Sequence, residues 1–282
     1  MRKRISFISV LTMFLAIGFV IIFSRPVKAA ANGVILKANR TYAAYDVTGD
    51  GMKDKIRIRA ANQTDDEAYT SLTVSVNGKT ACRLKNTRFY NVIANIYTLK
   101  NGQPFLYLYA PAENGDGPVC ALLKYTNGKF RKALDFTEIM AGYGNHRIGE
   151  VTNLNGNKIV ITESIVSYSL GINAINFTYK YVNGKFVPTS RYGSYKEIYS
   201  TDGSSRYFTV NSDLPAYARP GATAVNTTLK AGSLTKIIKC ALISGKMYIQ
   251  LECDGEIYWI KALENPPIAD NERQFMEVRY AG

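Results

Sequence analysis

Several residue types on which catalysis and metal binding often depend are scarce in this sequence. Its 282 residues include one histidine and one tryptophan, and its four cysteines form no CxxC pair. A zinc site built from cysteine and histidine is therefore not expected. A Ser-His-Asp or Cys-His triad would have to use His146, and no GxSxG elbow accompanies it. We therefore expect no enzymatic activity.

Phosphate-binding loops are missing as well. Neither GxxxxGK[ST] nor GxGxxG occurs between a strand-like and a helix-like segment. Glu113 with Asp116, and Asp254 with Glu256, are neighbouring acids of the kind that glycosidases use, but the sequence gives no geometry for either pair. An enzyme, or an accessory subunit of a cell-wall-remodelling system, is therefore the alternative function.

Long stretches rich in Leu, Ala and Glu are also lacking. The apolar stretches are short and rich in β-branched and aromatic residues, and the chain holds 20 Tyr and 12 Phe. This composition favours strands over helices. The hydrophobic content of 46% is ordinary for a folded protein, and the length allows two domains. We predict an all-β protein.

The N-terminal segment, residues 1–30, has the pattern of an export signal. The basic start MRKR precedes an uncharged apolar run from Ile5 to Ser24, and RPVKAAA offers cleavage after Ala29 or Ala31. The apolar run is also long enough to span a bilayer, so an uncleaved membrane anchor is the alternative. In both cases we expect the remaining chain to be secreted or to lie on the extracellular surface, with membrane contact only through this segment.

The chain that follows this segment is basic. It carries 30 Lys and Arg residues against 22 Asp and Glu, a net charge of +8. Outside the cell, such a charge attracts wall polymers, acidic glycans and lipid headgroups rather than nucleic acid. Because the basic residues are scattered along the sequence, an effect on solubility alone is an equal alternative. We expect a cell-wall polymer, a glycan or a surface protein as the partner.

An exported chain permits disulfides, but the cysteines are too few for a disulfide scaffold. Two of them flank a hairpin, and a turn at residues 244–245 would place Cys240 opposite Ile249 rather than opposite Cys253. Buried free thiols are therefore expected for at least two of the four. The four residues are Cys82, Cys120, Cys240 and Cys253.

The sequence contains an internal repeat of a little over 50 residues. VSVNGKTACRL, LKYTNGKFRKAL and YKYVNGKFVPTS share an Asn-Gly turn between two strand-like segments, with the asparagines at positions 77, 127 and 183. A second turn precedes each one, with its glycine at position 51, 102 or 156. Each unit therefore predicts strand, Gly turn, strand, loop, strand, Asn-Gly turn and strand.

Four-stranded antiparallel units of this length are typical of propeller blades. We therefore predict a propeller-like array of three such units in residues 31–192. Because closed propellers usually have about four or more blades, the array is expected to be open or irregular. The alternative is a generic β domain in which the hairpins coincide by chance. A linker is expected at residues 193–204, before the last unit.

The first Gly turn of the first unit, DVTGDGMKD, has the composition of a calcium loop. Its oxygen-bearing residues alternate along the chain, so that their oxygens can converge on one ion while the chain turns at Gly51. It is not an EF-hand, because Arg57 stands at the twelfth position and a strand-like segment follows. The candidate ligands are the side chains of Asp46, Thr48, Asp50 and Asp54 and the carbonyl of Met52.

This loop resembles the calcium loop of FG-GAP and VCBS repeats, which reads Asp-x-Asp/Asn/Thr-x-Asp-Gly-x-x-Asp just before a blade strand. The resemblance covers nine residues closely and about 160 residues loosely. It implies one Ca²⁺ ion, because the second and third units carry TLKNGQ and TNLNGN in place of the acids. The alternative is a solvated Asp/Gly hairpin without a metal.

The C-terminal unit, residues 205–282, has the spacing of a small β-barrel, with five short strands separated by turns. It resembles the bacterial Src-homology-3-like domain in four pieces, within residues 214–220, 229–234, 247–251 and 255–260. Members of that family dock wall peptides or proteins against exposed aromatic residues. The resemblance therefore implies a ligand site at Tyr217, Tyr248 and Trp259.

These observations favour a non-catalytic binding protein of the cell surface or wall. In this hypothesis the calcium-stabilised repeat region displays loops, and the C-terminal unit docks onto wall or protein.

Overall fold

The computed structural model describes residues 33–113 and 115–280, so the expected signal peptide or anchor lies outside the described residues. The described part of the chain consists of antiparallel strands and two short 3₁₀ turns, at Phe136–Glu138 and Asp270–Glu272. None of its helices is long and apolar enough to cross a membrane. The predicted all-β class is confirmed.

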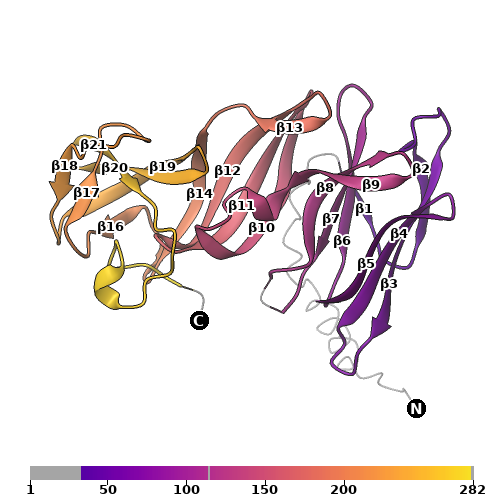
Figure 1. Ribbon diagram of the computed structural model, residues 1–282, viewed down its shortest axis with the longest axis horizontal. Helices are drawn as coiled ribbons and strands as arrows, with labels where there is room; N and C mark the ends of the chain where they lie inside the picture. Colours follow the sequence, from indigo (N-terminus) through magenta and orange to yellow (C-terminus); the bar gives the residue numbers. More distant parts are fainter. Residues whose placement is uncertain (1–32, 114, 281–282) are drawn as a thin grey trace, which may run out of the picture. The chain divides into compact units, whose positions relative to one another are not determined.

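The first and second sheets contain the first two predicted units (Figure 1). The first sheet joins its strands in chain order: β2 (Thr41–Tyr45), β3 (Asp54–Gln63), β4 (Tyr69–Val76) and β5 (Lys79–Phe89). The second joins β6 (Ile93–Thr98), β7 (Pro104–Ala110), β8 (Val119–Thr126) and β9 (Lys129–Asp135), with β1 (Val34–Leu36) added beside β6. Each unit is a four-stranded antiparallel meander.

The third unit forms one end of a larger sheet. Its strands are β10 (Gly144–Asn155), β11 (Lys158–Ser167), β12 (Gly171–Val182) and β13 (Lys185–Pro188). Beyond β12 the sheet continues through β14 (Tyr192–Ser200), β19 (Leu234–Ile243), β20 (Lys246–Cys253) and β21 (Glu256–Lys261). The third unit and most of the C-terminal strands are therefore hydrogen-bonded into one sheet.

The Asn-Gly turns adopt the conformation that their sequence predicts. Asn77, Asn127 and Asn183 have φ values of 50°, 51° and 50°, and the glycine that follows each also has a positive φ. Two consecutive positive φ values are the requirement of a type I′ turn, whose twist matches that of the flanking strands. The local chemistry of these turns thus fixes the pairing of the last two strands in each unit.

Strand β7 is buried on both faces because the second sheet contributes to two hydrophobic cores. Leu106 and Leu108 belong to a core shared with the first sheet. Phe105 and Tyr107, on the opposite face, belong to a core shared with the third sheet. This position explains the unbroken apolar run PFLYLYA, which differs from the alternation expected of a strand with one solvated face.

Residues 193–204 were expected to form a linker. In the structure they belong mainly to the strands β14 and β15 (Gly203–Ser204). β14 pairs with β12 on one side and with β19 on the other. Its Gly193 packs closely against β12, since an added Cβ would lie 2.5 Å from the Phe177 ring. The glycine therefore allows close packing of adjacent strands rather than chain flexibility.

No sheet of the described residues closes into a barrel, so the C-terminal barrel is not seen as such. The remaining short strands are β16 (Tyr207–Thr209), which pairs with β19, and the pair β17 (Leu214–Ala216) and β18 (Thr227–Leu229). The last segment, residues 262–280, returns to the third unit, where the Ile172 amide donates to the Arg279 carbonyl at 2.9 Å. Its buried Phe275 packs against Phe208.

All four cysteines are free, and three of them are buried. The hairpin of β19 and β20 places Cys240 opposite Ile249, as the turn at residues 244–245 predicts. Burial raises the pKa of the Cys240 thiol to about 12, although hydrogen bonds to backbone groups oppose this shift. The thiol therefore behaves as a small apolar side chain of the core.

Replacing Gly193 with valine should lower the free energy of unfolding by about 1–3 kcal/mol, because the new side chain overpacks the contact of β14 with Phe177. Urea denaturation followed by fluorescence would measure this change. Ser194→Val, at the next and exposed position, is the matched control and should change stability by less than about 0.5 kcal/mol. Equal stability of the two variants would contradict the packing of β14 in the sheet.

Candidate functional site

The Gly turn and the Asn-Gly turn of each unit meet at one end of its sheet, because the first and third turns of an antiparallel meander lie at the same end. In the first unit the Lys55 amide donates to the Asn77 side-chain oxygen at 2.8 Å, and the Asn77 amide donates to the Lys55 carbonyl at 2.9 Å. In the third unit the Tyr181 amide donates to the Asn157 carbonyl at 3.0 Å. The predicted calcium loop therefore lies against another turn.

Asp54 is the best-anchored residue of this loop. Its side chain is 1% exposed. One carboxylate oxygen accepts from the amides of Val47 and Thr48 at 2.7 and 2.9 Å. The other accepts from the Thr48 hydroxyl at 3.2 Å and from the Asn77 side-chain amide at 2.6 Å. Asp54 thus fastens the loop to the neighbouring Asn-Gly turn.

Asp46 organises the outer part of the loop. Its carboxylate accepts hydrogen bonds from the amides of Gly49, Asp50 and Gly51 at 2.6, 3.2 and 2.8 Å. The Thr48 hydroxyl lies 3.3 Å from it and shares its single proton between Asp46 and Asp54. Desolvation acts to raise the pKa of Asp46, but these hydrogen bonds outweigh it and lower the pKa below its ordinary value. The loop is therefore built around an ionised carboxylate.

Asp50 and Met52 lie at the exposed tip of the loop. Asp50 accepts one hydrogen bond through Oδ1, from the Met52 amide at 2.8 Å. The Met52 side chain is 69% exposed, so it contributes little to packing. Gly49 and Gly51 have φ values of 81° and 86°, which favour glycine and let the chain fold back around Asp46.

The chemistry of this loop fits a calcium ion. Calcium prefers six to eight hard oxygen ligands. Thr48 and Asp50 are exposed, and Asp46 is partly exposed, so their oxygens are accessible. Among the described residues no three His, Cys, Asp or Glu side chains are grouped as metal ligands. A calcium loop of this kind binds its ion partly through a hydroxyl oxygen and a main-chain carbonyl oxygen, which are not among those four residue types. In this structure the loop's carboxylates accept hydrogen bonds from amides of the loop.

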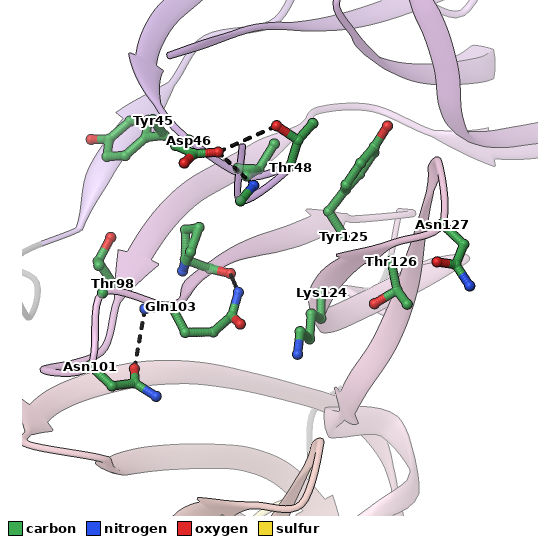
Figure 2. Close-up of a pocket in the computed structure, with 14 residues that line it drawn as sticks. Tyr45, Asp46, Thr48, Thr98, Asn101, Gln103, Lys124, Tyr125, Thr126 and Asn127 are labelled. Carbon is green, nitrogen blue, oxygen red and sulfur yellow. Dashed lines mark hydrogen bonds between the residues drawn. The ribbon is translucent and has the colours of Figure 1, made fainter. Parts of the chain in front are cut away.

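A recess of about 660 Å³ opens beside the loop, between the turns of the first two units. Figure 2 shows Tyr45, Asp46 and Thr48 along the top of the view, with Asn101 and Gln103 below them. Lys124 and Tyr125 of β8 also line the recess. The lining is rich in hydroxyl, amide and carbonyl groups, so this recess suits a polar ligand rather than an apolar one.

The three predicted aromatic ligand residues come together but are packed against one another. Tyr217, Tyr248 and Trp259 are 6%, 5% and 4% exposed and form a small cluster. Tyr192, which the sequence reasoning missed, lies at the edge of this cluster with its ring centre 5.9 Å from that of Trp259. Tyr192 is 41% exposed, and thus offers a ring surface that the other three do not.

The only histidine does not form a catalytic arrangement with a nucleophile among the described residues. His146 Nδ1 lies 3.4 Å from Asp116 Oδ2, and no serine or cysteine side chain in that part of the chain is hydrogen-bonded to it. His146 has a φ of 53° within β10, so it occupies an irregular point of the strand. Asp254 is the first residue of the tight turn between β20 and β21, and Glu256 is the first residue of β21 after it.

A carboxyl group that the sequence did not single out lies in the core. Glu163 is 1% exposed, and neither of its carboxyl oxygens has a hydrogen-bond partner among the described residues. It faces Gly149, where an added Cβ would lie 2.2 Å from Glu163 Oε1. Burial raises the pKa of Glu163 well above its ordinary value, and the charge of Arg147 opposes this only in part.

No protein-family model, curated protein or solved structure matches this chain.

Replacing Asp54 with alanine should lower the free energy of unfolding by about 2–4 kcal/mol both with calcium and with a chelator, because buried amides lose their acceptor. Chemical denaturation in the two conditions measures this. Asp50→Ala is the control at an exposed position and should cost less than about 1 kcal/mol in the chelator. A loss for Asp54→Ala that occurs only in calcium would contradict its anchoring role.

Replacing Glu163 with glutamine should stabilise the protein more at pH 8 than at pH 4. The pKa of Glu163 is raised in the folded state, so the protonated carboxyl contributes its full stability below the unfolded-state pKa of about 4.5. This stability is lost as the pH rises above that value, because the unfolded chain releases the proton more readily. The amide does not titrate, so the variant avoids this loss. Urea denaturation at both pH values measures the difference from the parent, with the exposed Glu150→Gln as control. If Glu163→Gln differed from the parent in stability by the same amount at both pH values, the raised pKa of Glu163 would be contradicted.

Proposed function

We propose that this chain is an exported, non-catalytic binding protein of the cell surface or wall, in which one calcium ion stabilises the first turn of the repeat region. The observation that carries the proposal is the loop of residues 46–54, where an ionised Asp46 is surrounded by backbone amides. Such a loop concentrates negative charge on an exposed turn, and a divalent cation would neutralise it.

Asp46, Thr48 and Asp50 would hold the ion through side-chain oxygens, and Met52 through its carbonyl. Asp54 is buried as well as hydrogen-bonded, whereas Asp46 is partly exposed, so Asp54 would mainly keep the loop closed against Asn77. Calcium would supply positive charge at the centre of the loop. The role is structural, because the ion would brace a turn beside the polar recess.

The three meanders are, in this proposal, blade-like units related to FG-GAP and VCBS repeats. Two observations support this: each unit has its Gly turn and Asn-Gly turn at one end, and the second sheet packs on one face with the first sheet and on the other with the third. The kinship of the C-terminal strands with Src-homology-3-like domains is proposed from sequence, for the strands and turns of residues 214–260.

The recess beside the calcium loop is the place where a surface partner would meet the repeat region. It is lined by turns of two units and by Lys124, whose ammonium lies 5.4 Å from the centre of the Tyr181 ring. Binding residues on loops held by a rigid sheet are a common arrangement. The basic charge of the chain would speed the approach of an anionic partner.

Calcium at millimolar concentration should raise the melting temperature of the purified protein by several degrees, since a ligand bound only to the folded state stabilises it. Calorimetry with and without a chelator measures the shift. Asp50→Ala should abolish the shift, whereas Asp65→Ala, an exposed acid outside the loop, should retain it. The absence of any shift in the parent, or equal shifts in both variants, would overturn the calcium proposal.

A further inference from the structure

The large sheet presents a continuous row of side chains on the face opposite its hydrophobic core. Cross-strand pairing aligns one residue from each of β11, β12, β14, β19, β20 and β21. Since paired residues share a face of the sheet, their side chains form a single line across it. The row is Thr162, Asn176, Ser194, Lys239, Gln250 and Trp259.

This row crosses the boundary between the third repeat unit and the C-terminal strands (Figure 1). With strands about 4.8 Å apart, its five steps extend over roughly 24 Å. All six residues lie on strands and not on loops, with one bulge in β19 just before Lys239. Its two end residues, Thr162 and Trp259, are buried at 2% and 4% exposure, so the part open to a ligand runs from Asn176 to Gln250. This part covers three strand steps, roughly 14 Å, and is a rigid surface suited to a short stretch of an extended ligand.

Lysines on this face are held over aromatic rings. The Lys239 ammonium lies 4.6 Å from the centre of the Tyr192 ring and 5.9 Å from that of Trp259. The Lys261 ammonium lies 5.0 Å from the centre of the Tyr217 ring. Neither lysine takes part in an ion pair within the described residues. Both charges are thus positioned without being neutralised by a carboxylate.

A recess of about 320 Å³ lies in the middle of the row. The Tyr192 ring and the Lys239 side chain line one part of it. The remaining lining is mostly hydroxyl and amide groups, from Asn176, Thr178, Thr189, Ser190 and Ser194. An exposed aromatic ring beside several hydroxyls and one cation matches a sugar ring, which has an apolar face, many hydroxyls and, in acidic sugars, an anionic group.

We propose that this recess and row bind a strand of an acidic polysaccharide, with a sugar ring stacked on Tyr192 and its carboxylate or phosphate paired with Lys239. Asn176 and Ser194 would bond the sugar hydroxyls. The partner class rests on the proposed binding function, but the site lies on a different part of the fold from the calcium loop. A neutral glycan would leave Lys239 without an anionic partner. A protein partner would leave many of the hydroxyl groups that line the recess without hydrogen bonds.

The test is calorimetric titration of the purified protein with four probes of similar length. A galacturonate hexamer carries carboxylates, a phosphorylated maltohexaose carries phosphates, maltohexaose is neutral, and a glutamate hexamer is an acidic peptide. At least one of the acidic polymers, the galacturonate or the phosphate one, should bind roughly tenfold or more tightly than maltohexaose, a free-energy difference of about 1.4 kcal/mol. Whichever binds more tightly identifies the anionic group.

Four variants locate the site. Tyr192→Ala and Lys239→Gln should each weaken binding of the preferred acidic probe roughly tenfold. Tyr192→Phe should retain binding, because it keeps the ring. Lys79→Gln, which makes the same charge change on an exposed residue of the first sheet, should also retain it. Circular dichroism confirms that each variant is folded before the titration.

Four results would overturn the proposal: no binding of either acidic polymer at millimolar concentration, equal binding of maltohexaose, tighter binding of the glutamate hexamer, or full binding by Tyr192→Ala and Lys239→Gln. The titration is repeated in a chelator and with Asp50→Ala, both of which should leave sugar binding unchanged. Failure of the calcium proposal is thereby separated from failure of the polysaccharide site.

Discussion

The pairing of β14 with both β12 and β19 is the constraint on which the C-terminal half of the structure depends. On the core face, this pairing buries Tyr195 and Ile198 together with strands of the third unit. On the opposite face, it places Ser194 between Asn176 and Lys239. A one-residue slip of β14 would move its buried side chains to the solvent face, so the core fixes the register of the outer row.

The hairpins could be predicted from sequence because their signal is local. Asn-Gly tolerates two positive φ values in succession, and the strands on both sides follow from the turn. β14 could not be predicted in this way. Its Ser, Gly and Tyr residues are typical of a linker, and its strand character comes from partners such as Phe177 and Cys240, the latter 47 residues away from Gly193.

The candidate residues show the same division. The alternating acids of the calcium loop were found from local spacing, but the anchoring of Asp54 by Asn77 depends on a residue 23 positions away. Tyr217, Tyr248 and Trp259 were found as a group, and their mutual packing leaves the neighbouring Tyr192 as the exposed ring. Lys239 is isolated in sequence among apolar residues, and only strand pairing brings it to Tyr192 and Trp259.

The most direct test of this account is amide hydrogen exchange of the native protein, followed by mass spectrometry on peptides from β12, β14 and β19. We predict that peptides covering residues 193–198 exchange slowly, because β14 pairs with β19 up to Ser194 and with β12 from Ser194 to Ile198. Fast exchange of residues 193–198, with slow exchange of β12 and β19, would contradict it. That result would show that residues 193–198 act as a linker. The side chains of β11 and β12 would then not be joined to those of β19, β20 and β21 in one row.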